Sequence, residues 1–386
     1  MKNTALFNFK MLSIIFFVFI VSASSCSDIS SKYDFAKVDS LFAAAIEDSV
    51  FPGAVALVGY KGEKVFEKAY GKFTYSPDAK VMTTDAIFDL ASVTKVIGTT
   101  SAAMILVDEG KLNLDEKVAA YLPEFGNNGK ENVTIRNILL HNTGLPAFKR
   151  YYLTMQTGEQ LINDIMNCEL DNPPGAKYVY SDLGMITLQK VIERITGKGI
   201  DKFLSEKLFK PLGMNDSYYA PPDEVIERCV PTELDDYWRH ELVKGKVHDE
   251  NAYMLGGVAG HAGLFSTADD ISKVIFTLLN DGKYNGEQIF DPELIKNWTT
   301  KQSEQSTRGI GWDTIDLEGY SSAGHKLSKN SFGHTGFTGT SVWADKDEDL
   351  FIILLTNRVY PTRKNRKISQ FRPVFHSTIY DILKRN

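Results

Sequence analysis

The chain has 386 residues, of which 43% are hydrophobic and 24% charged, and its formal net charge is −6. This is an ordinary globular composition, and the mildly acidic balance excludes a protein that depends on positive charge to bind nucleic acid. No repeat of 20–50 residues and no low-complexity tract is present, which excludes solenoids and disordered scaffolds.

The first 25 residues have the pattern of an export signal. Lys2 and Lys10 precede an apolar stretch, residues 11–21, which leads into small residues and then Cys26. The stretch is shorter than the roughly 20 residues needed to span a bilayer, so cleavage is favoured over a retained membrane helix. The junction resembles the lipobox of bacterial lipoproteins, although Ala23 stands where such boxes usually have Leu.

We therefore expect residues 1–25 to be a signal peptide and residues 26–34 to be a lipidated linker. Cys26 would carry the lipid and hold the protein on the periplasmic side of a bacterial membrane. The alternative is ordinary cleavage beside an incidental cysteine. Cys168 and Cys229 lack the spacing of a zinc site or a disulfide framework, so they are expected to be inert core thiols.

The remaining chain, residues 35–386, is long enough for one large domain or two interlocked subdomains, with strands predicted at both ends. Residues 35–49 have an amphipathic helical pattern, and residues 54–58 and 64–70 flank a glycine turn, as in a β-hairpin. Near the other end, two further strands are predicted at 339–344 and 350–356, followed by a helix at 370–384. These pieces, about 35–92 and 300–386, would form one α/β part.

The middle of the chain, about 93–300, predicts mainly helices. Apolar residues recur at helical spacing in residues 93–109 and 181–196, and these segments stop at Gly110 and Gly197. Shorter helices are predicted at 133–140, 158–166, 200–209, 268–280 and 292–298. The expected fold class is therefore α/β (α+β), an antiparallel sheet flanked by helices with an inserted, mainly helical subdomain. A ligand groove is expected between the two parts.

Ser92-Val93-Thr94-Lys95 is the one S-x-x-K sequence in the chain, and it opens the first long predicted helix. A spacing of three places Ser92 and Lys95 on one helix face, near the positive end of the helix dipole. A serine hydroxyl needs a base to become a nucleophile, and a desolvated lysine can serve. By itself the motif is weak evidence, because a chain of this length contains one or two such sequences by chance. The non-catalytic alternative is a capping serine beside a solvated lysine.

Two later motifs strengthen the hypothesis. Tyr180-Ser181-Asp182 opens another predicted helix, and the glycine-rich sequence 332–339, which contains His334-Thr335-Gly336, precedes a late strand. In this order the chain resembles the serine β-lactamase and penicillin-binding-protein superfamily, whose elements are S-x-x-K, Y-x-N and K-T-G. Residues 133–146 also resemble the I-T-I-R-x-L-L-T-H-T-S-G-L-P stretch of that family, and the likeness covers nearly the whole mature chain.

The resemblance implies a role for each matching residue. Ser92 would form an acyl-enzyme, and Lys95 and Tyr180 would share the proton transfers, with the choice of base left open. The backbone N–H groups of Ser92 and of Phe337, placed on the strand after the third motif, would form the oxyanion hole. His334, Thr335 and Gly336 would line the strand side of the substrate. No cofactor or metal is implied.

Two residues depart from the family pattern. Asp182 replaces the amide of Y-x-N, and His334 replaces the lysine of K-T-G. A carboxylate near Lys95 would stabilise its ammonium form and so favour Tyr180 as the proton acceptor. A neutral His334 would weaken the grip on a substrate carboxylate, so efficient turnover of β-lactams is not expected.

Further substrate contacts are predicted outside the three motifs. His248, Asp249 and Asn251 precede a glycine-rich stretch, residues 255–267, that resembles the segment in low-molecular-mass penicillin-binding proteins and serine-type N-acetylmuramoyl-L-alanine amidases; a structural network pinning this loop is the equal alternative. His261 is expected to be structural. A metal site from His248, Asp249 and His261 is disfavoured because no H-E-x-x-H spacing is present.

Two arginines after the last strand, Arg358 and Arg363, could bind a substrate carboxylate and compensate for His334, or could be surface residues. Taken together, the sequence predicts an exported serine hydrolase that cleaves an amide bond in peptidoglycan or muropeptides, as a muramoyl-peptide amidase or a D,D-carboxypeptidase. An esterase of the same fold is the first alternative, and a catalytically silent peptidoglycan-binding lipoprotein is the second. Its partners would be a small peptide or muropeptide and the membrane, but not nucleic acid.

Overall fold

The computed structural model describes Met1 and residues 32–385. The expected lipidation site, Cys26, and the expected signal peptide after Met1 lie outside the described residues. Among the described residues, no helix is both long and apolar enough to cross a membrane.

The central element is a six-stranded antiparallel sheet built from both ends of the chain. From edge to edge its strands are β10 (Asp313–Thr314), β11 (Ser331–Thr335), β12 (Ser341–Asp345), β13 (Leu350–Thr356), β1 (Gly53–Tyr60) and β2 (Glu63–Gly71). β1 lies beside β13, with Ala54 paired to Thr356 and Tyr60 paired to Leu350. Every residue of these two strands is buried, as expected for the middle of a covered sheet.

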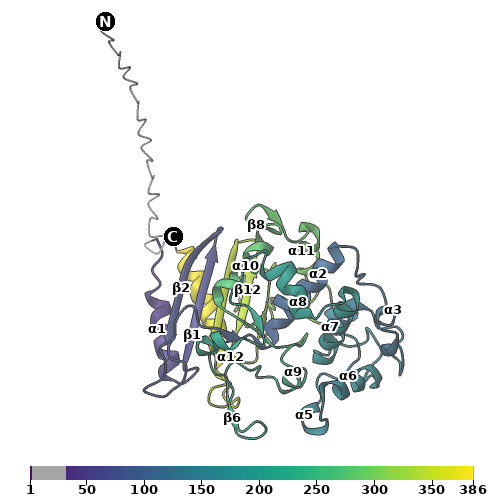
Figure 1. The fold of residues 1–386 in the computed structure, drawn as a ribbon. Helices are drawn as coiled ribbons and strands as arrows, with labels where there is room; N and C mark the ends of the chain where they lie inside the picture. Colours follow the sequence, from purple (N-terminus) through teal and green to yellow (C-terminus); the bar gives the residue numbers. More distant parts are fainter. Residues whose placement is uncertain (2–31, 386) are drawn as a thin grey trace.

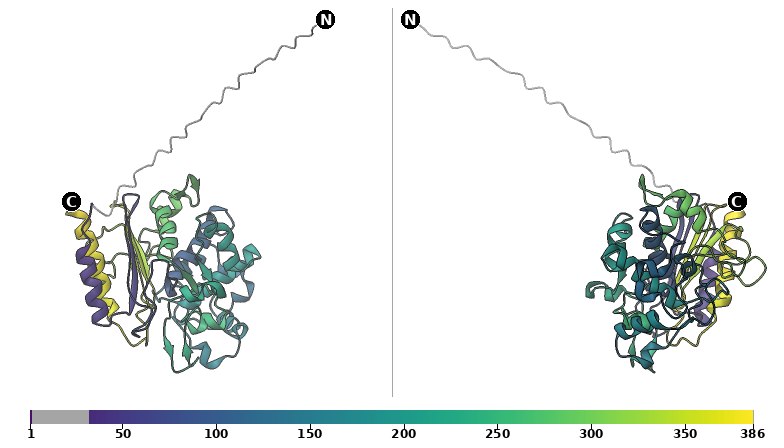
Figure 2. Two further views of the ribbon diagram at one scale, coloured as in Figure 1. Left: turned by 60° about the vertical axis from the view of Figure 1, so that its left-hand side comes forward. Right: turned by 90° about the vertical axis from the view of Figure 1, so that its right-hand side faces the viewer.

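Helices cover both faces of this sheet, as Figure 2 shows. α1 (Ala36–Glu47) and α12 (Ile368–Lys384), from the two ends of the chain, pack together on one face, where the Phe42 ring meets the edges of Phe371 and Phe375. On the opposite face α10 (Ala268–Leu279) packs against β1 and β13, and the other helices lie beyond it (Figure 1). The structure confirms the expected mixed class, an antiparallel sheet flanked by helices.

The helical body contains short helices around a large apolar core. Its α-helices are α2 (Ser101–Asp108), α3 (Val118–Tyr121), α4 (Ile135–Leu139), α5 (Tyr151–Thr154), α6 (Gly158–Asn167), α7 (Asp182–Thr196), α8 (Ile200–Leu204), α9 (Glu250–Met254) and α11 (Pro292–Trp298). Its 3₁₀ and π turns are η2 (Ala91–Val93), η3 (Lys95–Thr100), η4 (Pro123–Phe125), η5 (Ser205–Phe209) and η6 (Asp223–Arg228). Cys168 and Cys229 are buried free thiols here, and burial raises the pKa of both.

Small sheets tie the loops of this body together. β7 (Leu264–Ser266) lies between β3 (Phe88–Asp89) and β4 (Tyr218–Tyr219). Because β3 leads directly into η2, this sheet fixes the segment around Ser92 against the glycine-rich stretch before β7. Two hairpins complete the fold: β5 (Leu234–Asp235) with β6 (Glu241–Leu242), and β8 (Lys283–Tyr284) with β9 (Glu287–Gln288).

Candidate active site

Ser92 sits in a tight turn held by a buried carboxylate. The residue before it, Ala91, has a positive φ of 47°, a conformation that costs energy for a residue with a Cβ. The buried side chain of Asp89 accepts hydrogen bonds from the N–H of Ala91 at 2.8 Å and from the N–H of His248 at 2.6 Å. These bonds stabilise the turn, which presents Ser92 to a cavity of about 410 Å³.

Lys95 lies one turn further along and is almost completely buried. Its ammonium donates to Ser92 Oγ at 3.0 Å and to the carbonyl oxygen of His261 at 2.9 Å, and it lies 2.7 Å from a carboxylate oxygen of Asp182. Burial alone would lower the pKa of Lys95, but the Asp182 carboxylate and the Tyr180 phenol outweigh it and raise this pKa. The side chain is therefore an ammonium at neutral pH, with Ser92 as one of its acceptors.

Tyr180 lines the same cavity and packs between cations and neutral rings. The Lys95 ammonium lies 5.0 Å and the Arg308 guanidinium carbon 5.2 Å from the centre of its ring. The rings of His141 and His334 lie 4.5 and 6.0 Å away, centre to centre. Burial, followed by the charges of Arg308 and Lys95, lowers the pKa of both histidines well below 6.5, so both are neutral at pH 7.

Local structure fixes the second motif as firmly as the first. The Ser181 side chain caps α7 by accepting from the N–H of Gly184, which places Asp182 in the first helical turn. His141 Nδ1 accepts the N–H of Ser181 at 3.1 Å, and the His141 carbonyl accepts the N–H of Val179. The capped helix therefore holds Asp182 close to Lys95.

The third motif ends β11 and forms the turn into β12. His334 Nδ1 lies 2.9 Å from the carbonyl oxygen of Thr335, so this nitrogen carries the proton and Nε2 is left as an acceptor. Gly336 donates its N–H to Thr340, whereas the N–H of Phe337 has no acceptor among the residues that the structure describes. The sequence analysis placed Phe337 on the following strand; it lies in the turn before that strand, because Gly336 and Gly339 close the turn there.

Arg358 supports this turn. Its guanidinium carbon lies 4.4 Å from the centre of the Phe337 ring, and its Nε donates to the Phe337 carbonyl at 2.8 Å. Its Nη1 donates to the carbonyl oxygens of Arg363 and Asn365. Arg358 lines the cavity, as predicted for a substrate contact, but most of its hydrogen-bonding capacity is used within the protein.

Arg308 also lines the cavity, and the sequence analysis did not single it out. The side chain is buried, its Nε donates to the Tyr178 hydroxyl at 3.3 Å, and its Nη1 has no partner in the described part of the chain. Arg308 precedes β10 in a segment without a recognisable motif, so only the fold brings it to Tyr180 and His334. No signal in the sequence identifies it.

Four other predicted contact residues belong to a network behind the cavity. The His248 ring bonds Glu233 at 2.9 Å, and Arg363 forms ion pairs with Glu233 and Glu250. Asn251 is fully buried and donates to the Lys149 carbonyl, and Asp249 caps α9. None of these four residues lines the cavity of Ser92, and their bonds are those of a network within the protein.

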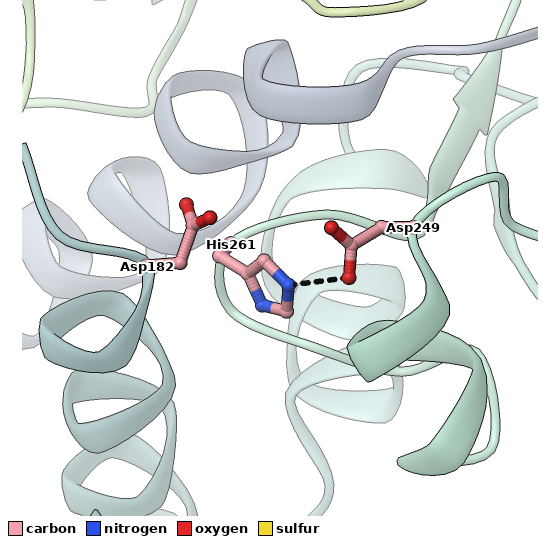
Figure 3. Close-up of side chains that lie close together, drawn as sticks. All are labelled: Asp182, Asp249 and His261. Carbon is pink, nitrogen blue, oxygen red and sulfur yellow. Dashed lines mark hydrogen bonds and ion pairs between the residues drawn. The ribbon is translucent and has the colours of Figure 1, made fainter. Parts of the chain in front are cut away.

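Three side chains that could bind a metal lie together beside Lys95. The set differs from the one weighed from the sequence, because it contains Asp182 where that one had His248. Ligand atoms of Asp182, Asp249 and His261 lie within 4.8 Å of one another, and Figure 3 shows the His261 ring between the two carboxylates. His261 Nε2 bonds Asp249 at 2.8 Å, the contact drawn as a dashed line in Figure 3. The Lys95 ammonium already supplies positive charge to Asp182, which makes this donor set a poor fit for a metal.

Comparison with known proteins identifies the family of this site. The sequence matches the Beta-lactamase family over residues 38–372, which include Ser92, Lys95, Tyr180 and His334. The chain belongs to the Beta-lactamase family. Accordingly, it is a serine hydrolase, and its resemblance to the β-lactamase and penicillin-binding-protein superfamily is confirmed.

Two curated relatives of this Beta-lactamase-family chain are about one third identical to it over the aligned residues. One, from Escherichia coli (strain K12), is assigned by name as a D-alanyl-D-alanine carboxypeptidase; it is 32% identical over 344 residues, covering 81% of this chain and 79% of the relative. The other is an N-acetylmuramyl-L-alanine amidase from Bacillus subtilis (strain 168), 33% identical over 341 residues, covering 80% and 77%.

Solved structures share the fold at lower identity. A penicillin-binding protein homologue from Caulobacter crescentus superposes with a TM-score of 0.72 at 20% identity, covering 90% of this chain and 97% of that protein. EstCE1, a hydrolase with promiscuous acyltransferase activity, also gives 0.72, at 22% identity and with coverage of 92% and 100%. These likenesses establish the fold of this Beta-lactamase-family protein and leave its substrate open.

Proposed function

We propose that the protein is an exported hydrolase that cleaves an amide bond in peptidoglycan or muropeptides through an acyl-Ser92 intermediate. Muramoyl-peptide amidase action is the preferred form, and D,D-carboxypeptidase action is the next. The observation that carries the proposal is the 3.0 Å contact between Ser92 Oγ and the buried ammonium of Lys95, in a cavity shared with Tyr180.

The geometry suggests a division of labour between Lys95 and Tyr180. Lys95 is held as an ammonium by Asp182 and therefore has no lone pair with which to accept the serine proton. In the proposed reaction, the Tyr180 oxygen takes the proton of Ser92 as Oγ attacks the substrate carbonyl carbon. The nearby ammonium stabilises the negative charge that Tyr180 needs for this role.

The remaining steps use the turn after β11. The tetrahedral oxyanion accepts hydrogen bonds from the N–H groups of Ser92 and Phe337, an arrangement in which each donor contributes on the order of 3 kcal/mol. Tyr180 then returns the proton to the leaving amine as the C–N bond breaks. Water repeats the sequence on the acyl-Ser92 ester, which releases the acid and restores the serine.

The names of the two curated relatives support an envelope substrate, since one denotes a muramyl amidase and the other a D-alanyl carboxypeptidase. The predicted signal and Cys26 anchor would place the enzyme on the periplasmic side of a bacterial membrane, where such substrates occur. An esterase is the alternative, because neutral His334 replaces the cation that K-T-G provides for a substrate carboxylate.

Intact-mass analysis of the protein after exposure to defined muropeptides tests the proposal. We expect a Ser92 adduct whose mass gives the acyl group, and released products that give the scissile bond. Ser92→Ala should show neither adduct nor turnover. Turnover of short-chain aryl esters without any turnover of muropeptides would instead establish the esterase.

A further inference from the structure

The cavity of Ser92 has a strongly positive end. Four arginines line the cavity and one carboxylate, Asp313, faces them, which leaves an excess of three positive charges on the wall. The arginines are Arg308, Arg358, Arg366 and Arg372. Because a cavity that concentrates charge of one sign attracts ligands of the other, this end is suited to an anion.

Two of these guanidinium groups have buried nitrogens without a partner. Among the described residues, Nη1 of Arg308 and Nε of Arg372 have no acceptor for their N–H groups, although both side chains are at least nine-tenths buried. A buried donor that loses water without gaining an acceptor is costly, and the cost is greater for a charged group. Both side chains line the cavity, so an anionic ligand there would meet their positive charge.

The charges of the wall are also poorly neutralised. Within the described part of the chain, Arg358, Arg366 and Arg372 have no carboxylate at ion-pair distance, and Arg308 reaches Asp313 at 4.0 Å. Burial lowers the pKa of Arg358 and of Arg372 to about 10, because the charged guanidinium loses hydration inside the protein. One carboxylate in the cavity would therefore leave positive charge uncompensated.

The start of α12 contributes to the same end of the cavity. Ile368 and Ser369, the first two residues of this 17-residue helix, line the wall beside Arg366. The N–H groups of Ser369 and Gln370 donate to the carbonyl oxygens of Arg366 and Lys367. The contribution of the helix is therefore the partial positive charge of its N-terminus, which favours an anion. The helix dipole and the arginines thus act in the same direction.

We propose that this positive end binds two carboxylates of the substrate, so that the enzyme acts on acidic peptides in preference to neutral amides or esters. The proposal rests on the proposed function of Ser92, whose cavity it shares. Arg308 and Arg372 would bind the groups that reach deepest, and exposed Arg366 would bind at the mouth. The second carboxylate distinguishes this class from substrates that carry a single terminal carboxylate.

Direct binding of an isosteric series tests the number of charges. The probes are N-acetylglutamate, N-acetylglutamine and N-acetylglutaminamide, which carry two, one and no carboxylates, titrated calorimetrically at constant ionic strength. We expect affinity to fall about tenfold with each charge removed, since each charge-assisted pair contributes at this level. Equal binding of the three, or tighter binding of inorganic phosphate than of N-acetylglutamate, would overturn the proposal.

Two exposed arginines at opposite ends of α12 form a matched pair of variants. Arg366→Gln removes a charge from the cavity mouth, whereas Arg385→Gln removes one at the far end of the helix. We expect about a tenfold loss of N-acetylglutamate affinity in the first and no change in the second. Arg308→Gln should lose more, with folding checked by its thermal transition.

The two proposals fail separately. Ser92→Ala should bind N-acetylglutamate as the unmodified protein does, because the binding wall is intact. Preserved binding in Ser92→Ala without acylation of the unmodified protein would refute the catalytic proposal alone. Acylation with no preference for the dicarboxylate, or equal losses in Arg366→Gln and Arg385→Gln, would refute the binding proposal alone.

Discussion

The Lys95 ammonium lies 2.7 Å from the Asp182 carboxylate and 3.0 Å from Ser92 Oγ. Asp182, one of the two residues that depart from the family pattern, therefore contacts the lysine that contacts the nucleophile. Since the carboxylate outweighs burial and raises the pKa of Lys95, this position sets the charge state of the site.

Replacing Asp182 should move the alkaline limit of activity. In Asp182→Asn, burial lowers the pKa of Lys95 without the Asp182 carboxylate to oppose it, so the ammonium is lost at lower pH. We expect the alkaline limb of the kcat/KM profile to shift to lower pH. Asp115→Asn, which breaks a surface pair with Arg136, is the control and should leave the profile unchanged. An unshifted limb in Asp182→Asn would show that activity does not require charged Lys95.

Tyr180→Phe should slow acylation while leaving the fold intact. The ring contacts with His141 and His334 are kept, and only the phenol oxygen is removed. Loss of a general acid–base group lowers the rate by about 10²–10⁴-fold. Rapid-quench mass measurement of acyl-Ser92 gives this rate. Tyr178→Phe removes the neighbouring phenol and should have a much smaller effect; a near-normal rate in Tyr180→Phe would remove Tyr180 from its role.

Two glycines near the site should respond oppositely to alanine. A Cβ on Gly336 would lie 2.1 Å from Thr340 Oγ1 and 2.4 Å from the Leu90 carbonyl oxygen, so the turn must shift relative to Ser92. We expect Gly336→Ala to lose at least about 1–3 kcal/mol of stability and most activity. In α7, a Cβ on Gly184 meets Ile138 at an ordinary 3.5 Å, so Gly184→Ala should gain up to about 1 kcal/mol. Denaturant melts and kcat values of both variants would check this contrast.

Acid should destabilise the protein through histidines that are buried in the neutral form. Burial lowers the pKa of His376 to about 4, whereas an unfolded chain titrates it at 6.5. The unfolded state therefore binds the proton first, and stability that is present above pH 6.5 declines as the pH falls toward 4, by about 3 kcal/mol for this residue. His141 and His334 act in the same direction.

Urea unfolding at a series of pH values between 7.5 and 4.5 measures this decline. His376→Gln should be less stable at pH 7.5 but should lose less stability on acidification. A parallel dependence in the two proteins would rule out His376 as a contributor.

Much of the fold could be predicted from local patterns. The predicted hairpin at 54–58 and 64–70 is found at Gly53–Tyr60 and Glu63–Gly71, and the helix predicted from residue 181 is found as α7. These elements have strong periodicity and clear glycine boundaries, so local sequence suffices.

Other elements depend on contacts that the pattern does not record. β11 contains Gly333, whose missing side chain makes room for Trp343 on the neighbouring strand, and its sequence has little alternation. The helix expected from residue 93 is a 3₁₀ turn, then a π-helical stretch, then α2. The 3₁₀, α and π helices form hydrogen bonds between residues three, four and five apart. The spacing of apolar residues is too coarse to distinguish them.

The candidate site divides in the same way. The three motifs predicted Ser92, Lys95 and Tyr180, which line or border one cavity in the structure. Arg308 and Arg372 carry no motif and reach the cavity through the packing of β10 and α12. Conversely, His248 and Arg363 looked like contacts because of their neighbours, but each is engaged by Glu233.

Asp89 makes the reactivity of this enzyme depend on a loop that is far away in the sequence. Its carboxylate joins the amide beside the nucleophile to the amide of His248, so the two segments cannot open independently. Fluctuations of the 248–261 loop would thus reach Ser92 directly. A substitution that loosens that loop would therefore lower turnover as well as thermal stability.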